Sequence, residues 1–314
     1  MGGSGGGARY HPLTPAQVGQ ELQSAGSQIQ RQLNQALLAQ RLEKLLSLPP
    51  SDDLRCLFLD AGQGNCAVVR TPDGRTIVID CNIEGANDNV VRMLKKAGIA
   101  DIDVLIATHP DWDHVSGLAS LAKHFRVGEL WKVTFSKTPD NASPESVEAF
   151  REYQSAVAAL REGGTRIVNP TVDTYDRVFG GARVEILAPF SRDAADYRDA
   201  NDACMVVRIS HKEKSILFAA DTTQATWKEL MNRGQVSATV LHASHHGSET
   251  GYVPGLMEAI NPSLVVVSVG PNPHGHPHEG PMSAYSKAPG GVRRTDDGLV
   301  GLQIAPDGTL TFAQ

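Results

Sequence analysis

Two histidines and two aspartates fall within six residues of this chain, in the run His109-Pro110-Asp111-Trp112-Asp113-His114. The run follows almost directly on an apolar stretch, Val104–Ala107, that we expect to form a buried strand, so four potential metal ligands share one loop at the strand's carboxyl end. Imidazole nitrogens and carboxylate oxygens suit Zn²⁺, Mn²⁺ or Fe²⁺, and this ligand set can serve two ions bridged by water. The alternative is a solvated acidic turn with chance histidines, which the position behind a buried strand disfavours. The sequence thus predicts a centre of two divalent metal ions, zinc or manganese.

Other parts of the chain contain further residues suited to such a centre. Asp221 follows the apolar stretch Ile216–Ala220, where the less favoured alternative is that an aspartate caps a helix. The adjacent histidines His245 and His246 lie in a serine- and glycine-flanked run, and His276 lies between Gly275 and Pro277.

These runs resemble, in order, the motifs of one known family. The metal run resembles the HxHxDH signature of the metallo-β-lactamase superfamily, with Asp111 standing where the second histidine usually falls. Leu59–Cys66 (LDAGQGNC) is similar to the DVGQGD stretch of the subgroup related to the hydrolase domain of the DNA-uptake protein ComEC, whose metal loop resembles HxDxDH. Leu241–Ser248 (LHASHHGS) and Gly275–Pro277 (GHP) are similar to the SHHGS and GHP elements of that subgroup. The similarity extends over residues 54 to 280.

The resemblance implies an α/β fold, the four-layer αββα sandwich of the metallo-β-lactamases. The sequence pattern agrees, because short β-rich runs pass into alternating helices and strands, which suggests stacked sheets inside layers of helix. The main strands that we expect are Arg55–Leu59, Cys66–Arg70, Thr76–Asp80, Val104–Ala107, Arg183–Leu187, Met205–Ile209, Ser215–Ala219, Ala238–Leu241 and Ser263–Val269.

The resemblance also implies a role for each candidate residue. His109 and Asp111 would join one metal site, Asp113 and His114 would join the other, and Asp221 would bridge the two ions. One of His245 and His246 would complete a metal shell, while the other would face a substrate phosphate or supply a proton. We assign His245 as the ligand of this pair.

One stretch departs from the wider superfamily. Many members place a histidine ahead of the strand that precedes the bridging aspartate, where this chain reads Asn201-Asp202-Ala203-Cys204-Met205. Asn201 or Asp202 would have to substitute, and of the two we assign Asp202 as a metal ligand. Oxygen donors in place of nitrogen favour a harder ion such as Mn²⁺.

Several neighbouring residues have structural interpretations. Gly62 and Gly64 permit a tight turn between strands, with the cradling of a phosphate as the equal alternative. His274 and His278 are typical of a solvated loop, and Trp112 is most simply a packing residue.

The chemistry implied is attack of water on a phosphodiester, by a hydroxide that bridges two metal ions. Asp113 would orient and help deprotonate the water, and His246 or His276 would contact developing negative charge. We therefore expect a binuclear metal-dependent hydrolase, a phosphodiesterase or nuclease that acts on a nucleic acid, a nucleotide or another phosphodiester, by analogy with the subgroup. Two alternatives stay open: a hydrolase of an amide, lactam or thioester, and a regulatory or interaction protein with a vestigial metal site. The full ligand set disfavours the last of these.

The chain divides by pattern into a flexible lead over residues 1–13, a helical segment over residues 14–50 and a hydrolase domain over residues 51–314. In the second segment, apolar residues spaced by threes and fours form one helical face, which Pro49 and Pro50 end. An apolar stripe of this kind must be buried, against the chain's own domain, a second copy or another protein.

The composition sets outer limits. With 314 residues and 41% hydrophobic content, the chain can bury a large core, and its net charge of −6 provides no basic footprint for nonspecific binding to DNA. The four cysteines contain no CxxC pair, and no apolar run approaches the roughly 18 residues of a membrane span. We expect a soluble cytoplasmic protein with reduced cysteines and no membrane partner.

Overall fold

The computed structural model describes residue 40 and residues 44–82, 89–134, 144–172, 174–193, 196–198 and 200–314. The chain forms two compact units, Met1–Arg41 and Leu42–Gln314, and the second is the subject here. The predicted lead over residues 1–13 lies outside the described residues, as does the predicted helical segment over residues 14–50 apart from residue 40 and its last seven positions. Of those, residues 44–47 are helical and the Leu46 side chain is fully buried.

Two β-sheets form the centre of the second unit. The eight-stranded sheet has the order β15-β14-β1-β2-β3-β4-β5-β6, and the seven-stranded sheet has the order β13-β12-β11-β10-β9-β8-β7. The first comprises β1 (Leu54–Phe58), β2 (Ala67–Arg70), β3 (Thr76–Ile79), β4 (Asp101–Ala107), β5 (Arg126–Lys132), β6 (Arg166–Val168), β14 (Val300–Ile304) and β15 (Leu310–Ala313). The second comprises β7 (Asp176–Phe179), β8 (Ala182–Ala188), β9 (Val206–His211), β10 (Lys214–Phe218), β11 (Val240–His242), β12 (Leu264–Val267) and β13 (Val292–Arg294).

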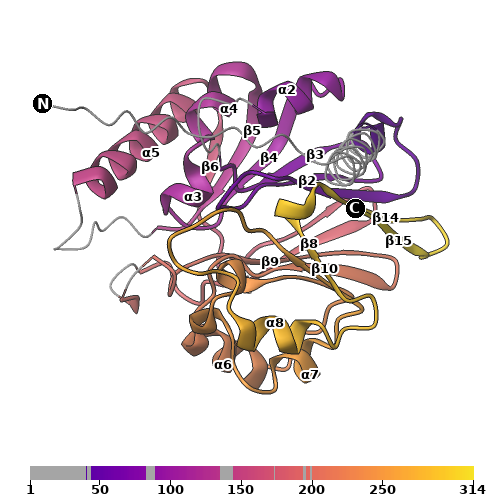
Figure 1. The fold of residues 1–314 in the computed structure, drawn as a ribbon. Helices are drawn as coiled ribbons and strands as arrows, with labels where there is room; N and C mark the ends of the chain where they lie inside the picture. The colour runs from indigo at the N-terminus through magenta and orange to yellow at the C-terminus, as the bar shows by residue number, and fades with distance from the viewer. Residues whose placement is uncertain are drawn as a thin grey trace, which may run out of the picture. The chain divides into compact units, whose positions relative to one another are not determined.

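Helices cover the outer faces of the two sheets (Figure 1). On one side lie α2 (Asn89–Lys96), α4 (Leu118–His124) and α5 (Pro144–Glu162), and on the other lie α6 (Gln224–Asn232), α7 (Leu256–Ile260) and α8 (Glu279–Tyr285). Short helical turns fill the loops: α3 (Trp112–Val115), η2 (Ser244–Gly247), η3 (Glu249–Gly251) and η4 (Thr295–Asp297). The predicted four-layer αββα sandwich is thereby confirmed.

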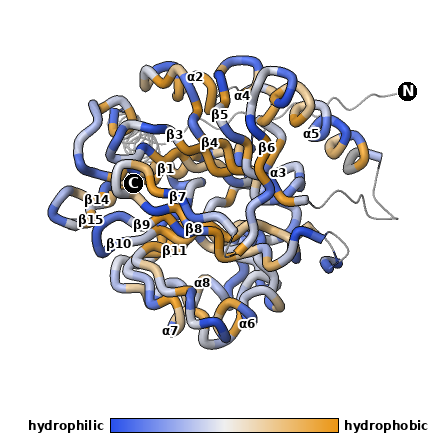
Figure 2. The backbone as a smooth tube through the Cα atoms, turned by 180° about the vertical axis from the view of Figure 1, so that it is seen from behind, coloured by the Kyte–Doolittle hydropathy of each residue, from blue (hydrophilic) through white to orange (hydrophobic). Residues whose placement is uncertain are grey.

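The strands alternate between two apolar layers. Phe58 of β1 and Phe218 of β10 meet between the sheets with ring centroids 5.7 Å apart, while Leu217 and Leu241 point the other way, into the layer beneath α6, α7 and α8. Because successive side chains of a strand face opposite sides, one strand fills both layers. Figure 2 shows hydrophobic colour along the strands and hydrophilic colour on many of the outer loops.

Parallel pairing places the candidate residues at one edge of the sandwich. β4 runs parallel to β3 and β5 in the first sheet, and β11 runs parallel to β10 and β12 in the second. Ligand sites in α/β folds form outside the carboxyl ends of such strands. The segments that follow β4, β10 and β11 contain all the predicted metal ligands except Asp202, which lies between β8 and β9.

Two further expectations concern cysteines and membranes. All four cysteines are free and buried. None of the helices in the described part of the chain combines the length and the apolar character that a bilayer span requires.

A buried arginine fixes the entry of the chain into the first sheet. Arg55 of β1 is 3% exposed and lies 2.8 Å from the Asp53 carboxylate. Its guanidinium also donates to the carbonyl oxygens of Leu48, at 2.7 Å, and Pro49, at 2.9 Å. Arg55 therefore ties residues 48 and 49 to the sheet.

Replacing Arg55 with alanine should lower the free energy of unfolding by about 3–5 kcal/mol, because the buried carboxylate of Asp53 loses its partner. Urea denaturation measures the change. The matched control is Arg126→Ala: the Arg126 side chain is 83% exposed and lies 3.9 Å from Asp101, and exposed pairs of this kind contribute at most about 1 kcal/mol. Equal losses from the two substitutions would contradict the role given to Arg55.

Candidate metal centre

Three segments bring seven of the predicted residues together. The segment after β4 contributes His109, Asp111 and, from α3, Asp113 and His114; the segment after β10 contributes Asp221; and η2, after β11, contributes His245 and His246. The first segment belongs to one sheet and the other two belong to the second sheet. The centre therefore lies where the edges of the two sheets meet.

Asp221 is the central residue of this group. Its Oδ1 atom lies 3.1 Å from His114 Nε2 and 3.8 Å from His246 Nε2. Its Oδ2 atom lies 3.5 Å from His245 Nε2 and 3.9 Å from His109 Nε2. The two oxygens of one buried carboxylate thus face two different pairs of histidines.

The remaining two aspartates each join one of these pairs. Asp111 Oδ2 lies 3.6 Å from His109 Nε2, and Asp113 Oδ2 lies 3.2 Å from His246 Nε2. Their side chains are 47% and 35% exposed, whereas those of His109 and His246 are buried. The aspartates therefore form the solvent-facing side of the group.

The donor atoms fit a bound cation. His109 Nε2, His114 Nε2, His246 Nε2 and Asp221 Oδ1 are all buried without a hydrogen-bond partner. A buried polar atom without a partner costs free energy, so four such atoms converging on one place indicate a ligand that satisfies them. Among the described residues, two groups have donor atoms close enough to hold one ion, namely His109–His114–Asp221 and Asp113–His114–His246.

Charge compensation dominates the protonation of the site. Burial alone would raise the pKa of Asp221, but His114 and His246 outweigh it and hold the pKa well below its usual value. Burial would likewise lower the pKa of His114, yet Asp221 and Asp80 raise it well above the usual value. For Asp113, burial is again outweighed, here by the imidazole of His246, whose Nε2 atom lies 3.2 Å away, and the pKa falls to about 2. The carboxylates thus favour the protonated forms of His114 and His246, and a metal ion bound by these imidazoles would compete with their protons.

Asp80 belongs to the site but is absent from the sequence-based prediction. Its Oδ2 atom lies 2.7 Å from His114 Nδ1, and its two oxygens accept hydrogen bonds from the backbone N–H and the hydroxyl of Thr108, each at 2.9 Å. A carboxylate on the far nitrogen of a ligating histidine fixes the orientation and tautomer of the ring. The signal was present in the sequence, since Asp80 ends the apolar stretch that forms β3, the parallel neighbour of β4.

The other histidines are oriented through main-chain and hydroxyl groups. His246 Nδ1 lies 2.9 Å from the carbonyl oxygen of Ser268, and His245 Nδ1 lies 3.1 Å from Thr250 Oγ1. These contacts leave each Nε2 atom directed at Asp221.

His245 and His246 both have positive φ, 49° and 54°, which is rare for residues with a side chain. Strain of this kind is characteristic of functional sites.

Asp202 lies apart from the two ligand groups. Its Oδ1 atom accepts a hydrogen bond from Thr223 Oγ1 at 2.9 Å, at the start of α6, and neither potential ligand group includes it. Asn201, the alternative at this position, has a buried Oδ1 atom without a hydrogen-bond partner, as the central donor atoms do.

The glycine loop supports the metal loop through its backbone. The N–H of Asn65 donates to the carbonyl oxygen of Asp113 at 3.0 Å, and a β-carbon on Gly64 would collide with that same oxygen. A β-carbon on Gly270 would collide with Gly62 in the same way. Gly62 and Gly64 both have positive φ, 72° and 147°, so of the two interpretations of these glycines the structure supports the tight turn.

His276 lies against the adjacent pair. Its ring stacks on His246 with centroids 6.3 Å apart and meets His245 edge-on at 5.5 Å, while its Nδ1 atom is buried without a partner. Burial, followed by the neighbouring His245, lowers its pKa to about 4. The ring centroids of His274 and His278 lie 5.5 Å and 5.0 Å from that of His276, so these loop residues also border the site.

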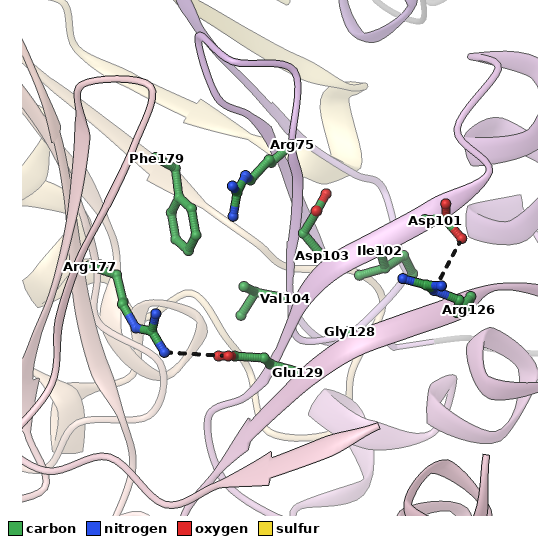
Figure 3. A pocket seen from close by; sticks show the side chains of 10 residues that line it. All are labelled: Arg75, Asp101, Ile102, Asp103, Val104, Arg126, Gly128, Glu129, Arg177 and Phe179. Carbon is green, nitrogen blue, oxygen red and sulfur yellow. Dashed lines mark hydrogen bonds and ion pairs between the residues drawn. The ribbon is translucent and has the colours of Figure 1, made fainter. Parts of the chain in front are cut away.

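A cleft of about 180 Å³ opens elsewhere, at the amino-terminal ends of β4 and β5 (Figure 3). Glu129 and Arg177 face each other across it at 3.4 Å, and Asp101 and Arg126 pair at 3.9 Å. The residues that line it include none of the predicted ligands. Its charged groups are paired within the protein, in contrast to the donor atoms of the metal centre.

Comparison with known proteins points to one family. The sequence model of the metallo-beta-lactamase superfamily matches residues 59–270. ComE operon protein 3 of Bacillus subtilis (strain 168) is 25% identical over 209 residues, which make up 66% of this chain and 25% of that protein. Competence protein ComA of Neisseria gonorrhoeae is 24% identical over 233 residues, or 73% of this chain and 29% of that protein. The chain thus matches less than a third of the length of either relative.

A solved structure with similarity to this chain is the metallo-beta-lactamase fold protein YhfI from Bacillus subtilis. The two share 13% sequence identity and superimpose with a TM-score of 0.47, over 83% of this chain and 100% of the other.

Replacing Asp80 with asparagine should weaken metal binding about 10- to 100-fold, because the amide cannot hold His114 as the carboxylate does. Equilibrium dialysis followed by elemental analysis measures the affinity. Asp103→Asn provides a matched control, since Asp103 also accepts a backbone N–H bond, from Thr76 at 2.8 Å, but lies on β4 away from its carboxyl end. Equal metal affinity in the Asp80 variant and the control would show that Asp80 has no part in ordering the centre.

Proposed function

Since this chain belongs to the metallo-β-lactamase superfamily, we propose that it is a metal-dependent phosphodiesterase or nuclease with two ions per site. The observation that carries the proposal is the buried carboxylate of Asp221, whose two oxygens face separate pairs of histidines. A carboxylate with this arrangement suits a bridge between two cations.

The distances from the histidine Nε2 atoms to the three aspartate carboxylates favour one assignment of the ligands. His109, Asp111 and His245 would hold one ion on the Oδ2 side of Asp221, and Asp113, His114 and His246 would hold the other on the Oδ1 side. From the sequence alone we assign His246 to the substrate and His245 to a metal ion. In this assignment both histidines are metal ligands. Asn201 is a better candidate than Asp202 for an additional oxygen donor, because its Oδ1 atom is buried and without a partner.

The metal ions, when bound, would lower the pKa of water and stabilise charge on the leaving oxygen. The protein's own groups have separate tasks. Asp113 stays ionised over the neutral range because its pKa is about 2, so its half-buried carboxylate can accept a hydrogen bond from the attacking water and orient it. His276, with a pKa of about 4, stays neutral and can donate one N–H bond to a phosphate oxygen.

A phosphodiester substrate is supported by the likeness to ComE operon protein 3 and competence protein ComA, and by motifs that resemble those of the DNA-uptake subgroup. Four of the seven donor residues are histidines, which suit Zn²⁺, and three are aspartates, which suit a harder ion. Because Asn201 would add a further oxygen donor, Mn²⁺ is the ion that we propose for the active form. We further propose a cytoplasmic location, from the unpaired cysteines.

The purified chain should bind about two Mn²⁺ or Zn²⁺ ions, and Asp221→Ala should lose both because it removes the shared ligand. His109→Ala should lose one. His124→Ala serves as the control, because the ring of His124 only contacts the carbonyl oxygen of Ser120, 2.9 Å away, within α4. Elemental analysis after dialysis gives the count. No uptake of either metal by the unaltered chain would refute the metal centre.

Hydrolysis of bis-p-nitrophenyl phosphate should disappear on chelation and return best with Mn²⁺. Asp113→Asn should lower kcat by about 10²- to 10⁴-fold, the range expected for the loss of a proton-accepting group. The release of p-nitrophenolate measures both effects. Turnover of nitrocefin or a thioester without any turnover of phosphodiesters would assign the site to amide or thioester chemistry instead.

A further inference from the structure

Trp112 exposes its indole on the segment that contains four of the proposed metal ligands. Its side chain is 45% exposed, although its chain neighbours Asp111 and Asp113 both border the centre. The other two tryptophans of the chain, Trp131 and Trp227, are fully buried. The expectation that Trp112 is a packing residue is therefore wrong, and its exposure requires another explanation.

Other large exposed hydrophobic side chains in the described part of the chain have no such location. Val178 belongs to β7 and Phe312 to the edge strand β15, while Leu48 precedes β1. Isolated exposed apolar residues are common on protein surfaces. Trp112 differs from them because it is part of the loop that carries four of the proposed metal ligands.

The backbone of Trp112 is held by the same contacts that order the ligands. Trp112 is the first residue of α3, and its carbonyl oxygen accepts a hydrogen bond from the N–H of Ser116 at 3.0 Å. Ser116 Oγ in turn donates to Asn82 Oδ1 at 2.7 Å. An aromatic group on an ordered backbone can bind a ligand with little loss of conformational entropy.

The position suits a group attached to the reacting phosphate. Consecutive Cα atoms are about 3.8 Å apart, so the indole begins one residue away from two ligands of the centre. In a nucleotide, one sugar separates the phosphate from a planar base, and bases bind exposed aromatic side chains by stacking, with little dependence on sequence. A neutral base is also compatible with the two flanking carboxylates, which would repel additional phosphates.

We propose that Trp112 is a stacking platform for the base of a nucleotide or single-stranded nucleic acid whose phosphate binds at the metal centre. The proposal rests on the phosphodiesterase function proposed above and narrows its substrate class. Small alkyl phosphodiesters would lack this contact.

Binding can be tested without turnover. Thymidine 5′-monophosphate and its base-free counterpart, 2-deoxyribose 5-phosphate, are titrated into the Zn²⁺-loaded full-length chain while tryptophan emission is recorded. The nucleotide should quench the emission and the sugar phosphate should not, because Trp131 and Trp227 are inaccessible. Absence of quenching by the nucleotide overturns the proposal.

Two substitutions distinguish the contribution of an aromatic ring from that of side-chain volume. By calorimetry, Trp112→Leu should raise the Kd of the nucleotide about fivefold to a hundredfold, the range of one lost base stack, and leave the Kd of the sugar phosphate unchanged. Trp112→Phe should keep most of the preference for the nucleotide. Metal analysis of each variant verifies that the centre is intact. Equal loss in the two variants would overturn the proposal, since the phenyl ring can still stack.

The remaining outcomes distinguish this proposal from the one on which it rests. Quenching by phosphocholine but not by the nucleotide would overturn base stacking and assign Trp112 to a cation. The protein could bind the nucleotide through Trp112 and yet show no phosphodiesterase activity. That result would support the stacking platform and contradict only the proposed phosphodiesterase function.

Discussion

A buried negative charge, the carboxylate of Asp221, constrains the edge of this domain that contains the candidate metal centre. A carboxylate in a low-dielectric interior is costly unless opposite charges face it, and four imidazole nitrogens lie within 3.9 Å of its oxygens. His109 and His114 come from one sheet, and Asp221 itself comes from the other. The charge is therefore faced by all four imidazoles only when the two sheets are packed together, which couples the folding of the sandwich to the assembly of its site.

Backbone strain is concentrated around the same carboxylate. Six non-glycine residues with positive φ occur in the described part of the chain, and four of them, Asp80, Ala220, His245 and His246, are members or chain neighbours of the centre. The N–H of His245 donates to the carbonyl oxygen of Ala220 at 2.9 Å, which ties two strained segments to each other. Such conformations persist only where surrounding contacts over-determine them, so the packing of strands and loops maintains the orientation of both histidines.

The glycines of the sequence motifs also support the metal centre. Gly64 allows the backbone of its loop to reach the carbonyl oxygen of Asp113, and Gly247 lies against Pro277, so the SHHGS and GHP motifs are in direct contact. Motifs far apart in the sequence thus form one layer beneath the ligands. This explains why glycine occurs at these positions without any contact to a phosphate.

The sequence by itself determined the family and the layers of this protein. Two histidines and two aspartates lie within the six residues 109–114, directly after an apolar strand, and this local arrangement suffices to predict metal ligands. Together with the other motifs and their order along the chain, it also predicts the αββα sandwich. Strands such as β5 and β14 escaped prediction because their pairing with β4 and β1, rather than their own pattern, makes them strands. Only the tertiary structure decided that Asp80 orients His114, that Asp202 accepts a hydrogen bond from Thr223 while the Oδ1 atom of Asn201 has no partner, and that Trp112 faces solvent. Residue type sets what an atom can bind, whereas the partner that it meets depends on the packing of segments distant in the sequence.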